Sequence, residues 1–136
     1  MDHLPEIVSK LLLNSKKDFL VAFWIDENED AFFRYANQNF IDFHKQLSIH
    51  ILEADLLDTQ LSDYFRFYLG FSEVDLNARL RPFKEALKTR APINFNEVSD
   101  HPGILALVLS STWIPVEVED QLFVIWESSV RQLSQK

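Results

Sequence analysis

The chain has 136 residues, with no cysteine and only two glycines. Without cysteine it can form neither disulfides nor thiolate metal sites, and it has no thiol nucleophile. Two glycines are too few for the loops that cradle phosphates in nucleotide-binding proteins. No apolar run approaches the roughly 18 residues that a membrane-spanning helix needs. The first residues also lack the basic-then-apolar order of a secretory signal. We therefore expect a cytoplasmic protein with no membrane segment.

Basic residues are also scarce, since 13 lysines and arginines face 21 aspartates and glutamates, for a net charge of −8. Nucleic acids and anionic membranes both bind proteins largely through basic side chains, so we expect neither as a partner. Hydrophobic residues, by contrast, make up 47% of the chain, with twelve phenylalanines against one methionine. This composition indicates one globular domain with a core of rigid rings.

Residues 19–43 contain the clearest local pattern. An apolar run over 19–25 predicts a strand, the acidic residues 26–30 predict a turn, and strand character returns over 31–36. After Asn37, apolar residues fit one face of a short helix. The pattern therefore predicts a hairpin that leads into a helix.

Both faces of the first predicted strand are apolar. Alternation places Leu20, Ala22 and Trp24 on one face and the odd-numbered residues from 21 to 25 on the other. A strand of this kind should be covered on both sides, and a helix N-terminal to it could supply the second cover. In the second strand, the same rule predicts that Phe33 and Tyr35 share a face.

The middle of the chain predicts short helical pieces over 47–71, with Asp58 and Ser62 as candidate caps and Gly70 after the last piece. A long helix is predicted next, with a kink or a break at Pro82. In the last strands, Pro115 implies an edge position or a bulge. The predicted long helix covers residues 75–89. The last part of the chain predicts three strands, over 93–98, 104–118 and 122–126.

Several motifs in this order resemble a PAS domain, a family of small sensory modules in signalling proteins, here expected to be bacterial. The opening of that family is matched by Ile25-Asp26 and by Tyr35-Ala36-Asn37. The end of its long helix resembles FKEALKTRAPI, in which Arg90 stands where the family usually has glycine. Its closing hairpin resembles TWIPVEVEDQLFVIWESSVRQL. The resemblance implies an α+β fold, with a five-stranded antiparallel sheet and short helices and one long helix on one face.

The resemblance also implies domain organisation and function. We expect an amphipathic cap helix within residues 1–18, a PAS-like domain over 19–131, and the start of a linker over 132–136. The domain would sense a small ligand or a partner and pass the signal to an output domain, such as a histidine kinase or a diguanylate cyclase of a two-component system. That output domain would lie in the same polypeptide or in a partner signalling protein.

Cofactor chemistry known in the family is disfavoured by the residues present. Haem-binding members commonly hold the iron with a histidine on the long helix, and residues 75–89 contain none. Covalent flavin attachment needs a reactive cysteine, which the chain lacks. We therefore expect no identified cofactor and no metal. A small-molecule pocket would instead combine aromatic walls with polar handles, although such rings are also typical of plain core. The candidate pocket residues are Trp24, Tyr35, Asn37, Trp113 and Trp126.

The first residues carry an aliphatic stripe at helical spacing. Two roles remain open for this helix, namely a cap on its own sheet or a dimerisation helix in a homodimer. As a dimerisation helix it would make the chain a ligand-free interaction module. The candidate interface residues are Leu4, Ile7, Val8, Leu11 and Leu12.

Other motifs give less support for a site. Asp26, Asn28 and Asp30 imitate the start of a calcium loop, but Ala31 and Asn37 stand where that loop needs glycine and glutamate. Positive charge along the long helix indicates a solvated face, a contact for an acidic partner, or one arginine turned inward. No catalytic grouping is present, so we expect no enzyme; a small α+β cone enzyme would require a buried carboxylate with a raised pKa.

Overall fold

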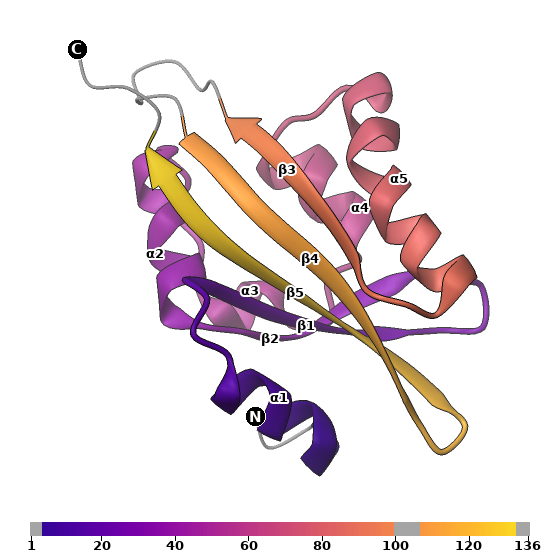
Figure 1. Ribbon diagram of the computed structural model, residues 1–136. Helices are drawn as coiled ribbons and strands as arrows, with labels where there is room; N and C mark the ends of the chain where they lie inside the picture. The colour runs from indigo at the N-terminus through magenta and orange to yellow at the C-terminus, as the bar shows by residue number, and fades with distance from the viewer. Residues whose placement is uncertain (1–3, 100–106, 133–136) are drawn as a thin grey trace.

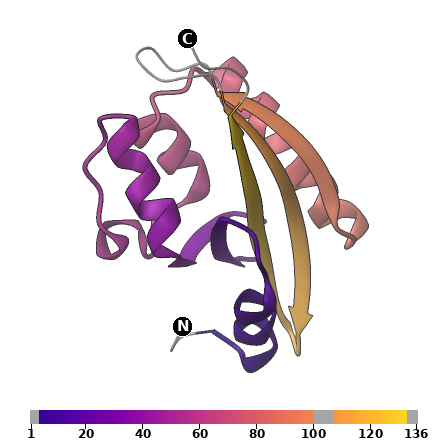
Figure 2. The ribbon, with the colours of Figure 1, turned by 60° about the vertical axis from the view of Figure 1, so that its left-hand side comes forward.

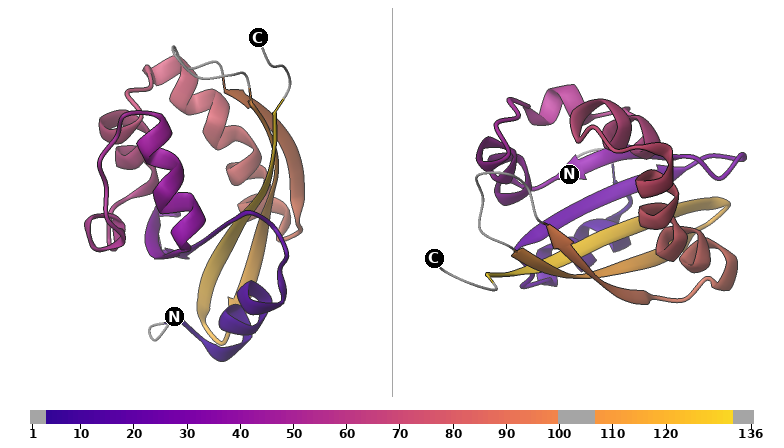
Figure 3. Two further views of the ribbon diagram at one scale, coloured as in Figure 1. Left: turned by 90° about the vertical axis from the view of Figure 1, so that its left-hand side faces the viewer. Right: turned by 90° about the horizontal axis from the view of Figure 1, so that it is seen from above.

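The computed structural model describes residues 4–99 and 107–132. They form one five-stranded antiparallel sheet with strand order β2-β1-β5-β4-β3. In chain order the elements are α1 (Glu6–Asn14), β1 (Phe19–Ile25), β2 (Ala31–Ala36), α2 (Gln38–Gln46), α3 (Glu53–Leu56), α4 (Leu61–Asp63), the π-helix η1 (Tyr64–Tyr68), α5 (Glu73–Thr89), β3 (Ile93–Ser99), β4 (Leu107–Val118) and β5 (Gln121–Gln132). Helices α2 to α5 cover one face, here called the inner face, and α1 lies against the other, the outer face (Figures 1 and 3). This is the predicted α+β architecture.

The β1–β2 hairpin has the predicted bounds. In its turn, an Asp26 carboxylate oxygen accepts hydrogen bonds from the backbone N–H groups of Asn28 and Asp30, both at 2.9 Å. The residues that imitate a calcium loop therefore stabilise a turn. Within the described residues, no group of three or more histidines, aspartates and glutamates could hold a metal ion.

The prediction that Phe33 and Tyr35 share a face is wrong. The register of β1 against β2 shifts between Ala22 and Phe23, where β2 contains one extra residue. Phe33 consequently packs in the inner core, whereas Tyr35 packs with the outer cluster. A bulge inserts one residue without a partner and so reverses the alternation beyond it.

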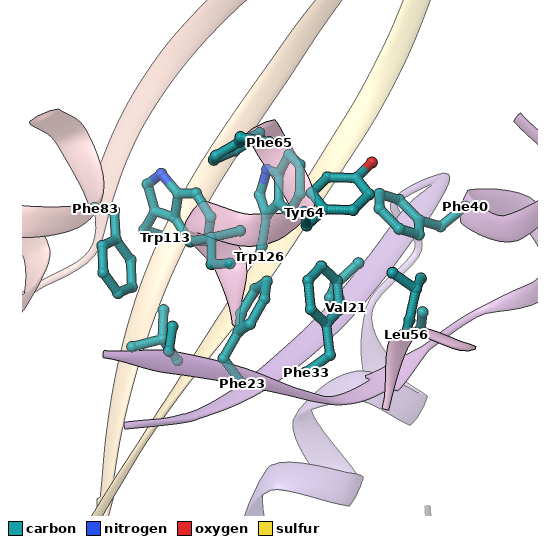
Figure 4. Close-up of a cluster of buried hydrophobic side chains, with 14 of the residues drawn as sticks. Val21, Phe23, Phe33, Phe40, Leu56, Tyr64, Phe65, Phe83, Trp113 and Trp126 are labelled. Carbon is teal, nitrogen blue, oxygen red and sulfur yellow. The ribbon is translucent and has the colours of Figure 1, made fainter. Parts of the chain in front are cut away.

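Apolar side chains cover both faces of β1, as predicted. The inner face joins Val21 and Phe23 to a cluster of buried hydrophobic side chains from every helix between α2 and α5 (Figure 4). On the outer face, Val8 and Leu12 of α1 pack on Leu20. Figure 2 shows α1 beside the turn end of the β4–β5 hairpin, which adds Val116, Phe123 and Ile125 to this outer cluster. The N-terminal helix therefore caps its own sheet.

The short helices begin at residues other than those predicted. Asn37 caps α2, but the caps of α3 and α4 are Leu52 and Gln60. Asp58 instead adopts a left-handed conformation and pairs with Arg34 of β2, so tertiary contacts replace its expected capping role. Gly70, with φ +69°, follows η1 as predicted.

Helix α5 begins after Ser72, whose hydroxyl accepts a hydrogen bond from the N–H of Asp75 at 3.2 Å. Pro82 lies inside the helix without dividing it. The helix continues because Leu76, Phe83 and Leu87 on either side of the proline are buried on the inner face. Packing of this kind contributes more to helix stability than one backbone hydrogen bond.

Arg90 ends α5 with φ 56°, in the left-handed region that glycine occupies most readily. Its guanidinium donates to the carbonyl oxygen of Leu87 at 2.6 Å and pairs with Glu117 of β4 at 3.0 Å. These contacts hold an arginine where the resemblance leads one to expect glycine.

Replacing Arg90 separates the backbone strain from the side-chain contacts. Both R90A and R90G lose the contacts, but only R90G relieves the left-handed strain, which costs about 1 kcal/mol. We expect R90G to be more stable than R90A by about that amount in urea unfolding. Equal stabilities would show that the residue is not strained.

The last strand is longer than predicted. Beyond Trp126, where the apolar run stops, residues 127–132 still pair with residues 107–112 of β4. Ser128 and Val130 continue the inner-face alternation, which the search for an apolar run missed. Pro115 lies beyond the part of β4 that pairs with β3, so it occupies a local edge as predicted. The predicted turn after β3 and residues 133–136 lie outside the described residues.

Candidate functional site

The structure divides the five candidate pocket residues among three places. Trp113 and Trp126 lie together on the inner face, with ring centroids 5.0 Å apart and planes at 25°. Trp24 and Tyr35 lie on the outer face with the cluster under α1. Asn37 caps α2. The five residues therefore do not line one pocket, because alternation along β1 and the bulge in β2 turn two of them to the opposite side.

Asn37 has a structural role at the junction of β2 and α2. Its side-chain oxygen accepts from the N–H of Phe40 at 3.1 Å, and its amide nitrogen donates to the carbonyl oxygen of Asp18 at 3.0 Å. Both polar ends of the side chain are therefore engaged within the chain itself.

Rings from five elements surround the two inner tryptophans. Trp113 packs against Phe23 of β1, Phe83 of α5 and Phe95 of β3, with centroid distances from 5.2 to 5.8 Å. Trp126 packs against Phe40 of α2 at 5.6 Å and Phe65 of η1 at 6.4 Å (Figure 4). The tryptophan pair therefore lies where the sheet meets both α5 and the short helices.

Neither inner indole N–H group has a hydrogen-bond acceptor in the described part of the chain. Trp113 is 0% exposed and Trp126 is 6% exposed. A buried donor without an acceptor costs about 1–3 kcal/mol, and such groups are rare in native structures. Here two such donors lie on residues that are paired across β4 and β5, which makes the tryptophan pair an unusual polar feature of the core.

A second polar feature of the core joins α2 to η1. His44 Nδ1 lies 2.8 Å from the carbonyl oxygen of Phe40, which can only accept, so Nδ1 carries the proton. His44 Nε2 then accepts a hydrogen bond from the Tyr64 hydroxyl at 2.6 Å. Burial, and then the nearby charge of Glu97, raises the pKa of Tyr64, which keeps its hydroxyl a donor.

Burial lowers the pKa of His44 below its ordinary value of 6.5, although backbone hydrogen bonds to Phe40 and Ile41 act in the opposite direction. As the pH falls below about 6.5, the unfolded chain therefore takes up a proton that the folded chain excludes. We expect the free energy of unfolding to fall from pH 7 to pH 5, and to fall less in H44Q. Thermal unfolding across this range measures the difference. His50 is exposed, so H50Q should keep the wild-type dependence; an unchanged slope in H44Q would contradict the prediction.

Glu97 of β3 is a core residue that the sequence interpretation missed. Its mostly buried carboxylate pairs with Arg79 of α5, whose guanidinium also lies over the ring of Phe71. Burial raises the pKa of Glu97, while the charge of Arg79 and its hydrogen bond lower it. Ile93, Phe95 and Glu97 alternate onto one face of β3, and an acid on an apolar face is the signal that could have revealed it.

A buried carboxylate with a raised pKa is what a cone enzyme would require. Glu97 has this property, but its carboxylate is bound by Arg79. A general base must have a carboxylate oxygen free to face a substrate proton. The arrangement favours a structural ion pair between β3 and α5.

The other basic residues of α5 divide into two groups. Arg90 pairs with Glu117. Arg81, Lys84 and Lys88 are exposed and line a shallow depression with Asn77 and Glu85. Arg79 is turned inward, but it binds the carboxylate of Glu97 in the chain itself and not that of a ligand, which was the role considered for such an arginine.

The predicted dimerisation residues lie on different sides of α1. Val8 and Leu12 are buried against the outer face of the sheet, so they are not available to a partner. Ile7 is 51% exposed and Leu11 43% exposed, while Leu4 is half-buried. Of the five predicted residues, Ile7 and Leu11 are therefore the two that are exposed enough to contact a second copy of the chain. In the described residues, no helix is both long and apolar enough to cross a membrane.

Comparison with known proteins identifies the fold. No family model matches the chain, and no curated protein matches it. Among solved structures, it is similar to a PAS domain from a two-component sensor histidine kinase, with 16% identity and a TM-score of 0.50 over 94% of this chain and 95% of that one. It is also similar to the PAS domain of the fruit-fly ELK potassium channel, with 10% identity and a TM-score of 0.56 over 97% and 100%. The chain therefore has the PAS fold that its sequence predicted.

Proposed function

We propose that this chain, which has the fold of a PAS domain, is a sensory or regulatory domain. It binds a small ligand between the inner face of the sheet and helices α2 to α5, and it passes the signal to an output domain. Residues 19–131 form the sensory unit, and residues 132–136 begin the connection to the output.

The course of β5 is the observation that carries this proposal. β5 lies between β1 and β4, so backbone hydrogen bonds hold it on both sides. It contributes Trp126 to the inner core and then continues to Gln132 without a break. A ligand that alters the packing around Trp126 would favour one position of this strand over another and so bias the position of an attached output domain.

The solved structures of similar fold suggest the kind of output. One is a PAS domain from a two-component sensor histidine kinase and the other is from a potassium channel. A histidine kinase or a diguanylate cyclase is the output domain that we propose, in the same polypeptide or in a partner.

Native mass spectrometry of gently purified protein, beside its denatured mass, tests ligand binding. We expect an added mass in the native spectrum that disappears on denaturation, and that mass would begin to identify the ligand. A native mass equal to that of the bare chain, from several expression hosts, would count against a ligand sensor.

The exposed side of α1 supports a second proposal, that the chain acts as a homodimer. Combining I7D with L11D places two charges on that side and should yield a monomer by light scattering. Leu13 is 69% exposed and points away from Ile7 and Leu11, so L13D is the matched control and should remain dimeric. A dimer that survives I7D and L11D would exclude this side of α1 as the interface.

A further inference from the structure

The two inner indole N–H groups face the same part of the core. Figure 4 shows both nitrogen atoms at the same side of the stacked rings, the side on which Phe65 lies. Trp113 comes from β4 and Trp126 from β5, and the two residues are directly paired across these strands. The sheet therefore fixes the two indole rings against each other, with both N–H groups directed toward the side of Phe65, where one small molecule could approach them.

Tryptophan can donate through its indole N–H but cannot accept there, so this place offers donors only. A water molecule would take both hydrogen bonds but would then need acceptors for its own two hydrogens. Within residues 4–99 and 107–132, neither indole nitrogen has an acceptor within hydrogen-bond distance. A carbonyl oxygen needs donors alone, which makes it the better match.

The charges nearby indicate that the ligand is uncharged. The guanidinium of Arg79 is already paired with Glu97, and the acceptor nitrogen of His44 is already bonded to Tyr64. The rings of Phe23, Phe40 and Phe83 also pack against the indoles, and they carry no charge. Because Arg79 is already paired, it is not free to compensate an anion placed here, which makes the burial of an anion costly.

Phe65 lies at the side of the indole rings that carries both nitrogen atoms (Figure 4). Its ring packs on Trp126 and stacks on Phe71, with centroids 5.4 Å apart. It belongs to the π-helix η1, and single π-helical turns occur frequently at functional sites. Movement of Phe65 is therefore the change that would admit a ligand to both N–H groups.

We propose that Trp113 and Trp126 form a donor pair that binds the carbonyl oxygen of a small, uncharged aromatic compound, admitted by displacement of Phe65. This inference rests on the proposed sensory function and names the class of ligand. Both tryptophans are ligand-binding residues, and Phe65 is the gate.

Acetophenone and ethylbenzene test the proposal, because they have nearly the same shape and only the first has a carbonyl group. Titration of ¹⁵N-labelled protein follows the indole N–H signals of Trp24, Trp113 and Trp126 separately. We expect acetophenone to move the signals of Trp113 and Trp126 downfield and to leave that of Trp24, on the outer face, in place. Ethylbenzene should bind about ten-fold more weakly, as expected for the loss of two hydrogen bonds.

Two variants remove one donor each and keep an aromatic ring. W113F and W126F should each weaken acetophenone binding several-fold and leave ethylbenzene binding unchanged, whereas W24F should change neither. If a variant does not fold, the ratio of the two affinities in the wild type still decides the question. Equal affinities for the two compounds, or no binding of either, would overturn the proposal.

The native mass measurement distinguishes this failure from failure of the proposed function. An added mass that persists in W113F and W126F would mean that the chain is a ligand sensor whose ligand binds elsewhere. In that case Trp113 and Trp126 would have a packing role in the core and no role in ligand binding.

Discussion

Replacing Trp113 with alanine is expected to lower the free energy of unfolding by about 3–5 kcal/mol. Trp113 is fully buried and contacts rings from β1, α5, β3 and β5. Its removal leaves a cavity at the point where the sheet meets α5, and the rigid neighbours cannot collapse to fill it. W113A also removes the buried indole N–H that lacks an acceptor, but this gain in stability is smaller than the loss caused by the cavity.

Urea unfolding followed by circular dichroism measures the effect, with Phe67 as the control. Phe67 is also a large aromatic residue, but it is 77% exposed, so F67A should lie within about 0.5 kcal/mol of the wild type. A loss below about 1 kcal/mol in W113A would mean that the inner core is loosely packed. The aromatic contacts of Trp113 would then not be the main stabilising interaction of the fold.

The second large effect is expected on the outer face, where L12A should cost about 2–4 kcal/mol. Leu12 is 1% exposed, and its side chain packs with residues of β1, β4 and β5. The loss of stability in L12A cannot exceed the free energy with which α1 docks on the sheet, because once the helix has detached its side chains make no further contribution.

Leu13 supplies the matched control, since it is the next residue of the same helix and is mostly exposed. L13A should change the free energy of unfolding by less than about 0.5 kcal/mol. If L12A and L13A have the same stability, α1 does not cap the sheet in solution. In that case the outer cluster would be free to bind a second copy of the chain, and the dimer would form there.

Local signals explain why parts of the fold could be predicted from the sequence. The β1–β2 hairpin was predicted to the residue because an apolar run, an acidic turn and a second run follow one another within 18 positions. The two apolar faces of β1 also predicted a second cover, and α1 supplies it through Val8 and Leu12. Each of these patterns depends only on residues that are close to one another in the sequence.

The features that were missed depend on contacts between distant residues. The bulge opposite Ala22 and Phe23 leaves no mark in the sequence, yet it moves Tyr35 out of the candidate pocket. Likewise, the partner of Arg79 could not be known before α5 was placed against β3. Of the candidate pocket residues, Trp113 and Trp126 therefore share the inner face, whereas the bulge and the alternation turn Tyr35 and Trp24 to the outer face.

The pairing of β1 with β5 also has a consequence for how the chain folds. It joins the two ends of the described chain, as does the hydrogen bond from the Ser15 hydroxyl to Glu127, 112 positions away. Contacts this far apart in sequence form slowly, because a long loop must close before they contribute any stability. During synthesis, the edge of the β1–β2 hairpin that pairs with β5 must therefore stay unpaired until β5 leaves the ribosome. Slower synthesis at low temperature, or a chaperone that shields this hairpin, should raise the yield of folded protein more than any change in the turns.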